Sequence, residues 1–376
     1  MKSRNILLLL LLVATATVIA LSWRNQARPQ TAPPESRAPS HPRDTEELPI
    51  PTRRIPLRPP GPGSSSTATN QLTPWQQTLA RLQSEAFHSL PREQIEAYLR
   101  RSSRDPANLL AAYRLSRDKI YLAEAAQTHP HDPRIQVAML ADSDLTPEQR
   151  QQWLARLKQS APDNALANCL AAADLFKSKQ TAAALQELAA AAQKNRFDDY
   201  ATADLNTTEE MLLLSGKSPI ESKAIAFSGT SLPHISTVNA LSKEIAALQK
   251  DALAHGDPAA AQSYAALAVG LARQITAGPS GSLLIEQLVA MSIEKRVLEP
   301  LAQNQTFDLL RQTPAERLAI LKAQREEIRF LTQAADAFDP NSGLTESEVL
   351  AYFERLKNSG ELAALRWLNT YRTNAP

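Results

Sequence analysis

Residues 161–194 read APDNALANCLAAADLFKSKQTAAALQELAAAAQK, and this stretch predicts the fold more clearly than any other. Alanine and leucine, both strong helix formers, fill it on either side of the polar residues 178–180. The pattern predicts one helix, a short turn and a second helix rich in small residues.

The same stretch resembles a tetratricopeptide repeat, a family built from paired helices. Ala172, Ala184 and Ala191 stand where that family places the small residues that let two helices approach closely. Residues 161–164 resemble the family's junction between repeats. The resemblance implies a solenoid of stacked helical hairpins that offers a concave surface to partners.

A second unit is expected at residues 131–164, one period of about 34 residues earlier. Ala138 takes its first small position, but Arg150 stands where the family has alanine. Residues 105–106 match residues 132–133 but precede them by less than one full period. The unit between them is therefore shortened or belongs to a looser helical repeat. Ordinary helix pairs packed in a globular bundle remain the alternative.

A second signal, Ser, Thr or Asp directly before proline, predicts helix starts along the chain, because the first residue caps and proline lacks the amide that would be left unbonded. It occurs at Thr73, Asp105, Asp132, Thr146, Ser218, Asp257 and Thr313. Longer helices are expected after Gly216, at about 233–254, 258–276, 282–302 and 314–338, then a pair at 346–357 and 361–372. We therefore expect an all-α body, with repeat-like helices over 74–217 and a C-terminal helical segment over 218–376.

The composition excludes several classes of partner and site. The chain has 41 Lys and Arg against 39 Asp and Glu, so no strong field favours nucleic acid as a partner. Cys169 is the single cysteine, which excludes an intrachain disulfide and a cysteine-based metal cluster. No pattern indicates a small-molecule cofactor.

The N-terminal segment, residues 1–23, predicts attachment to a membrane. The run from Ile6 to Trp23 carries no charge, follows Lys2 and Arg4, and as a helix would span about 27 Å. We expect a retained transmembrane anchor with the body on the extracytoplasmic side, periplasmic or extracellular. A cleaved signal peptide and a secreted protein are the alternative, because small residues stand at Ala14, Ala16, Ala20 and Ser22.

Residues 24–73 differ sharply in composition from the helical body after them. They are rich in proline and serine and poor in large apolar residues. Such a stretch cannot form a core, so we expect a disordered linker that separates the body from the membrane.

Glu221 is the main catalytic candidate. Residues 220–222 (IES) resemble the catalytic-glutamate motif of cell-wall lytic transglycosylases, but the glycine-leucine-methionine motif that should come next is absent. Glu221 is also the third helical residue after Ser218, which predicts a capping box.

Three further groups give weaker signals. His129, His131 and Asp132 lie in an interhelical turn without a further ligand set, so no metal site is predicted. The acidic stretch from Asp336 to Glu348 lacks the glycine and glutamate spacing of a calcium loop begun at Asp339, and Thr345 and Glu348 are better explained as a capping box. Ser231 and His234 flank Pro233 without the glycines of a serine elbow, and Pro233 more simply begins a helix.

We therefore expect a non-enzymatic protein-binding or scaffold protein, with a cell-envelope polymer-acting enzyme that uses Glu221 as acid as the alternative. The tetratricopeptide resemblance implies a partner surface on the first helix of each unit, suited to a short amphipathic or acidic-ended peptide. Its residues are Ile135, Met139, Cys169, Ala173, Phe176 and Lys177. The alternative is that later helices fold over this stripe and make it core.

The anchor prediction is tested by alkaline carbonate extraction of native membranes. A transmembrane helix resists this treatment because its apolar surface stays in lipid, so the protein should remain in the pellet. A mature N-terminus at Thr17 or Trp23 would show cleavage and contradict the anchor.

Overall fold

The computed structural model describes Gln77 and residues 89–230, 232–278, 283–334 and 344–374. Within these ranges the regular elements are α-helices, and the loops hold two isolated β-bridges, so the expected all-α fold is confirmed. The predicted membrane helix at 6–23 and linker at 24–73 lie outside the described residues. Among the described helices, none combines the length and hydrophobicity needed to cross a membrane.

The predicted capping signal marks the helix starts. Six capping side chains accept a backbone N–H from the first turn: Asp105 from Asn108, Asp132 from Arg134, Thr146 from Gln149, Ser218 from Glu221, Asp257 from Ala260 and Thr313 from Glu316. Each bond satisfies an amide that has no partner within the helix. The seventh signal, at Thr73, lies outside the described residues.

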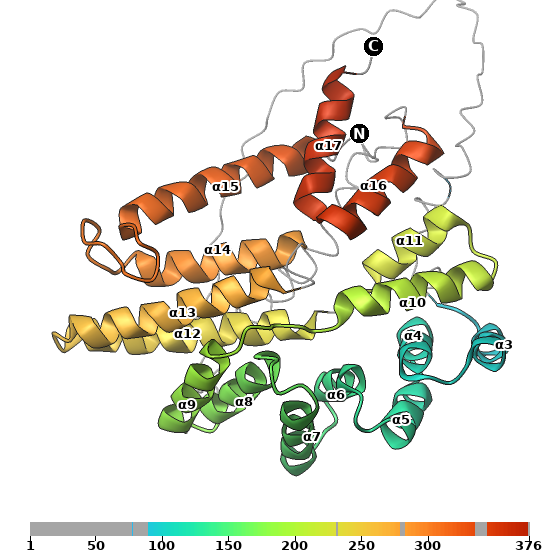
Figure 1. Cartoon of the computed structure of the whole chain (residues 1–376), viewed down its shortest axis with the longest axis horizontal. Helices are drawn as coiled ribbons and strands as arrows, with labels where there is room; N and C mark the ends of the chain where they lie inside the picture. Colours follow the sequence, from blue (N-terminus) through green and yellow to red (C-terminus); the bar gives the residue numbers. More distant parts are fainter. Residues whose placement is uncertain (1–76, 78–88, 231, 279–282, 335–343, 375–376) are drawn as a thin grey trace, which may run out of the picture.

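Helices α3 to α9 form an arc in which each helix packs on the next (Figure 1). They are α3 (Arg92–Ser102), α4 (Pro106–Ser116), α5 (Lys119–Thr128), α6 (Pro133–Leu140), α7 (Pro147–Ser160), α8 (Leu166–Lys177) and α9 (Thr181–Ala192). α8 and α9 form the predicted hairpin, and Ala172, Ala184 and Ala191 are buried there as expected. The arc is compatible with a helical-repeat solenoid, and its narrower assignment to the tetratricopeptide type stays a prediction.

The unit at 131–164 departs from a regular hairpin at the place where its sequence departs from the family pattern. α6 has only 8 residues, and a loop separates it from α7. Arg150, which stands where alanine was expected, donates from Nε to Asp174 Oδ2 at 2.6 Å and from Nη1 to Leu140 O at 2.6 Å. Its long side chain thus ties α7 to the end of α6 and to α8.

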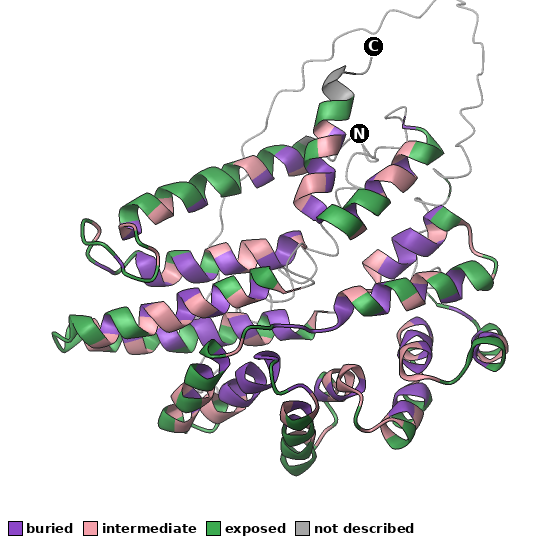
Figure 2. Cartoon of the chain, viewed as in Figure 1, coloured by how far each residue is buried: buried purple, intermediate pink, exposed green. Residues whose placement is uncertain are grey.

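The rest of the chain consists mainly of longer helices, close to the predicted ranges. They are α10 (Ala201–Leu214), α11 (Pro219–Ser228), α12 (Pro233–Ala254), α13 (Pro258–Ala277), α14 (Leu284–Leu298), α15 (Pro314–Ala334), α16 (Glu346–Ser359) and α17 (Glu361–Asn374). α12, α13 and α14 pack side by side, and α16 and α17 pair with each other. α15 contacts α14 and α17 and exposes most of its other face (Figure 2).

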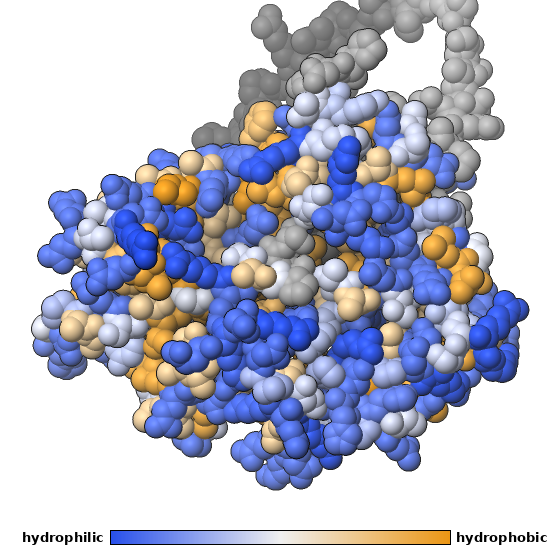
Figure 3. All heavy atoms as spheres, in the orientation of Figure 1, coloured by the Kyte–Doolittle hydropathy of each residue, from blue (hydrophilic) through white to orange (hydrophobic). Residues whose placement is uncertain are grey.

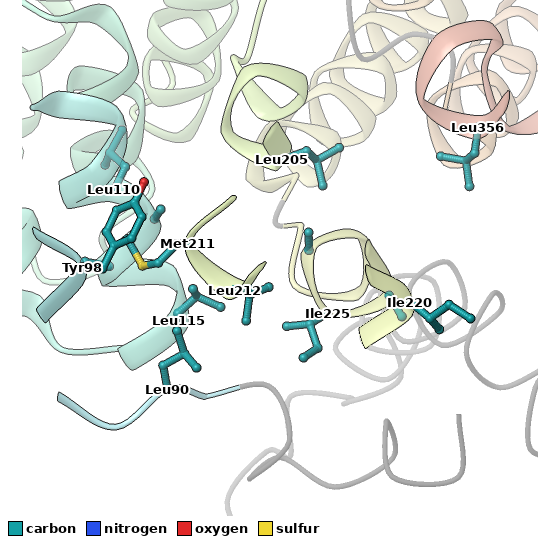
Figure 4. Packing of buried hydrophobic residues seen from close by; sticks show 14 of the residues in the cluster. Leu90, Tyr98, Leu110, Leu115, Leu205, Met211, Leu212, Ile220, Ile225 and Leu356 are labelled. Atoms are coloured by element: carbon teal, nitrogen blue, oxygen red, sulfur yellow. The ribbon is translucent and has the colours of Figure 1, made fainter. Parts of the chain in front are cut away.

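The described residues form two hydrophobic cores. The first core joins α3, α4, α5 and the start of α6 to α10, α11, the end of α15, α16 and α17 (Figure 4). The second core joins the end of α6, α7, α8 and α9 to α12, α13 and α14. Both cores therefore contain residues from the expected segments 74–217 and 218–376.

The inner side of the arc is occupied by the chain itself. α10 packs against α4, and α12 packs against α8 (Figure 1). In a solenoid this side is the usual place for a bound partner. Here it is built into the two cores.

Candidate functional site

The six predicted partner-binding residues do not form one open surface in this structure. Ile135, Cys169 and Ala173 are buried at 0%, 0% and 7% exposure. Ile135 and Met139 belong to the first core, whereas Cys169, Ala173 and Phe176 belong to the second. Lys177 is exposed, and Met139 and Phe176 are half-buried. Binding at this accessible edge stays a prediction.

Burial also decides the chemistry of Cys169. Loss of hydration raises the pKa of its thiol to about 12. The thiol therefore stays protonated near neutral pH, and a protonated thiol is neither a nucleophile nor a metal ligand.

The carboxylate of Glu221 is held in the predicted capping box. Ser218 N–H donates to Glu221 Oε2 at 2.9 Å, and Glu221 N–H donates to Ser218 Oγ at 3.3 Å. The side chain is half-buried at the start of α11. This is the geometry of a helix cap, in which the carboxylate satisfies an amide that would otherwise lack a partner.

The turn with His129, His131 and Asp132 has structural contacts. Asp132 caps α6 and binds Arg134, with 2.7 Å between Asp132 Oδ2 and the guanidinium. His129 Nε2 lies 3.2 Å from the carbonyl oxygen of Arg104, and His131 is exposed. Ser231 and residues 336–343 of the acidic stretch lie outside the described residues, whereas Thr345 and Glu348 form a capping box at the start of α16.

The structure brings together a different set: Asp199, His234 and Glu286. Asp199 lies between α9 and α10, His234 at the start of α12, and Glu286 in the first turn of α14. His234 Nδ1 is 3.1 Å from Asp199 Oδ2, and His234 Nε2 is 3.1 Å from Glu286 Oε1. The three side chains are 3%, 2% and 0% exposed. This group is the candidate functional site.

Asn164 holds the backbone that carries Asp199. Its Nδ2 donates to Asp198 O at 2.7 Å, and its Oδ1 accepts from Asp198 N and from Leu166 N, each at 3.1 Å. The neighbouring Arg196 O accepts from Ala165 N at 2.8 Å. The extended link between α9 and α10 is thus bonded to the start of α8.

The turn into α10 fixes the direction of Asp199. Tyr200 has a left-handed backbone with φ 62°, and its N–H donates to Asp198 Oδ1 at 2.7 Å. Asp199 Oδ1 accepts from Ala201 N at 3.1 Å. With Oδ1 held by the first turn of α10, Oδ2 is the oxygen that faces His234.

Phe197 and Gly278 form one wall of the site. The Phe197 ring meets the His234 ring edge-on, with 5.6 Å between the centroids. A Cβ at Gly278 would lie 2.2 Å from the carbonyl oxygen of Phe197, so only glycine lets the end of α13 approach this closely. The wall is therefore tightly packed.

Charge around the cluster is negative. Asp204, on α10, is also buried and binds Arg114. Burial raises the pKa of Asp204, Arg114 and Arg134 oppose that change, and the charge of Asp199 adds to it. Asp199 and Asp204 are therefore close enough to repel each other.

Sequence reasoning missed this cluster because its members are far apart along the chain. His234 was weighed only with Ser231, its near neighbour. Asp199 and Glu286 stand 35 residues before and 52 residues after it, in no recognised motif. A useful signal was present in residues 197–200 (FDDY), where two consecutive acids sit between aromatic residues at a helix boundary.

Comparisons with known proteins give no assignment. No protein-family model, no curated protein and no solved structure matches the chain.

The different burial of Ala173 and Lys177 predicts different effects of the same introduced charge. Ala173→Glu should destabilise the protein by about 2–5 kcal/mol, because the carboxylate would enter the second core without a partner. Lys177→Glu, four residues further along α8 and solvent-exposed, is the matched control and should leave the thermal midpoint nearly unchanged. Equal midpoints for Ala173→Glu and the wild type would contradict the burial.

Proposed function

We propose that this chain is a non-enzymatic protein-binding scaffold, held at a membrane by residues 6–23, with its helical body on the extracytoplasmic side. The observation that carries the proposal is the capping box at Ser218 and Glu221. The Glu221 carboxylate already accepts the Ser218 N–H at the start of α11. The main catalytic candidate in the sequence therefore has a structural role.

The rest of the molecule is arranged in a way that supports binding rather than catalysis. The arc of helices presents many short helix ends and loops to solvent, whereas its inner side is filled by α10 and α12. On the face drawn in Figure 3, apolar side chains gather in small separate patches between polar ones. Patches of this kind suit limited contacts with a partner.

One edge of the predicted binding stripe remains available to a partner. Phe176 is half-buried and Lys177 is exposed, both in the last turn of α8. Lys177 Nζ lies 3.6 Å from Asp174 Oδ1, and because Lys177 is exposed this long ion pair contributes little to stability. The ammonium can therefore turn to an acidic group of a bound peptide at small cost.

The alternative, an enzyme that cleaves a cell-envelope polymer with Glu221 as acid, requires that carboxyl to leave its cap and meet a substrate. Capping bonds of this kind contribute about 0.5–2 kcal/mol, so such a movement would cost little. The two functions therefore need an experiment on Glu221 itself.

The test places a photo-reactive cross-linking residue at position 176 in the full-length protein in its own membranes. The proposal predicts a discrete cross-linked partner that disappears with Lys177→Glu, since that change replaces attraction to an acidic group by repulsion. Glu221→Gln should preserve both the cross-link and the stability, because glutamine keeps the reciprocal capping bond. Ser218→Ala should cost about 0.5–2 kcal/mol of stability without loss of the cross-link.

Two results would contradict the proposal. A cross-linking pattern identical in the wild type and in Lys177→Glu would show that no specific partner binds at this edge. Loss of a measurable polymer-cleaving activity in Glu221→Gln, at unchanged stability, would establish the enzyme instead.

A further inference from the structure

The two contacts of His234 differ in direction although they have the same length. Nε2 makes a well-directed hydrogen bond to Glu286 Oε1 at 3.1 Å. Nδ1 and Asp199 Oδ2 are also 3.1 Å apart, yet neither atom makes a hydrogen bond. In the tautomer with its proton on Nε2, the ring donates to Glu286 Oε1 and presents the lone pair of Nδ1 to Asp199 Oδ2.

Two acceptors at this distance repel each other unless a positive charge lies between them. A metal ion with bonds of about 2.1 Å to a nitrogen and an oxygen fits a 3.1 Å separation with an N–metal–O angle of about 95°. That angle is close to octahedral and within the range of distorted tetrahedral sites.

Buried charge gives an independent reason for a cation here. Asp199 and Glu286 are two carboxylates at 3% and 0% side-chain exposure, with Asp204 as a third acid nearby. The ion pair of Arg114 is with Asp204. Asp199 Oδ2 accepts no hydrogen bond, and a buried carboxylate oxygen without a counter-charge costs several kcal/mol. A divalent ion would supply that positive charge.

We infer that Asp199, His234 and Glu286 form a binding site for one divalent transition-metal ion, with Asp199 Oδ2 and His234 Nδ1 as ligands and Glu286 as the acceptor that orients the imidazole. One ligand atom from each of the three residues lies within 4.8 Å of the others. This site goes beyond the proposed scaffold function and does not depend on it.

The donor set indicates the class of metal. An imidazole nitrogen with carboxylate oxygens suits Zn²⁺, Mn²⁺ and related first-row ions, whereas Ca²⁺ and Mg²⁺ prefer oxygen alone. The bond from Nε2–H to Glu286 matches the usual arrangement in which a metal-bound histidine donates its other N–H to a carboxylate. Asp199 Oδ1 is likewise held, by Ala201 N. Waters that enter with the ion would complete its coordination.

The location of the cluster gives the ion a structural role. Asp199 lies where the chain leaves the second core for the first, and His234 lies where it returns. Glu286 follows Leu284 of the first core and precedes Ala290 of the second. An ion at this point would bind the first two crossings directly and the third through the bond between His234 and Glu286, and so stabilise the contact between the cores.

The test is a titration of chelator-stripped, full-length protein in detergent with Zn²⁺ and, separately, Mn²⁺. The inference predicts about one bound ion per chain and an unfolding midpoint that rises with its concentration. Asp199→Asn should abolish this binding, and Glu286→Gln should weaken it by about 10–100-fold. Glu294→Gln is the matched control, because Glu294 is a buried acid of α14 that binds Arg317 instead; it should bind the ion as the wild type does.

Two results would overturn the inference. The first is a wild-type protein that binds neither ion, or whose midpoint does not rise with either; this result needs no variant and stands even where Asp199→Asn fails to fold. His234 would then serve only as a structural contact between Asp199 and Glu286. The second is equal binding by the wild type and a folded Asp199→Asn, which would place the ion on surface histidines such as His129 and His131.

Discussion

The fold depends on the side chain of Asn164, which bonds to both backbone groups of Asp198. An amide side chain offers both an acceptor and donors. The Asn164 side chain therefore makes the two hydrogen bonds to Asp198 that a neighbouring strand would make in a sheet. Without it, the buried N–H and C=O of Asp198 would each lack a partner, at about 1–3 kcal/mol per group. The link between α9 and α10 can run through the interior only because these groups are satisfied.

The link between α9 and α10 connects the two cores. The chain leaves the second core after Phe197 and enters the first core again at Leu205 on α10. α12 then returns to the second core with His234 against Asp199, and α14 closes the cluster with Glu286. α10 and α12, which follow two of these crossings, lie along the inner side of the arc. The inner side of the arc is thus filled by the same segments that connect the two cores.

Local structure was largely predictable from the sequence, because capping and helix periodicity depend on neighbours within four residues. The starts at Asp105, Thr146 and Ser218 and the long helices α12 and α13 appear close to the predicted positions. The stripe on α8 could not be assigned in the same way. Cys169 and Ala173 share a face in any α8, but whether that face meets solvent or α12 depends on packing between segments about 70 residues apart. The cluster of Asp199, His234 and Glu286 was missed because three distant segments create it.

The two cores should unfold as one unit, because the link at residues 196–200 joins them. Trp153 packs on the second core and Trp367 on the first, so each core has its own fluorescent residue. The measurement is urea unfolding of two full-length variants that each keep one of these tryptophans and carry phenylalanine at the other three positions, with and without Asn164→Ala. We expect coincident transitions for the two cores, and a shift of both to lower urea in the Asn164→Ala background. Separate transitions, or a shift confined to the Trp153 signal, would contradict the joining of the cores by this link.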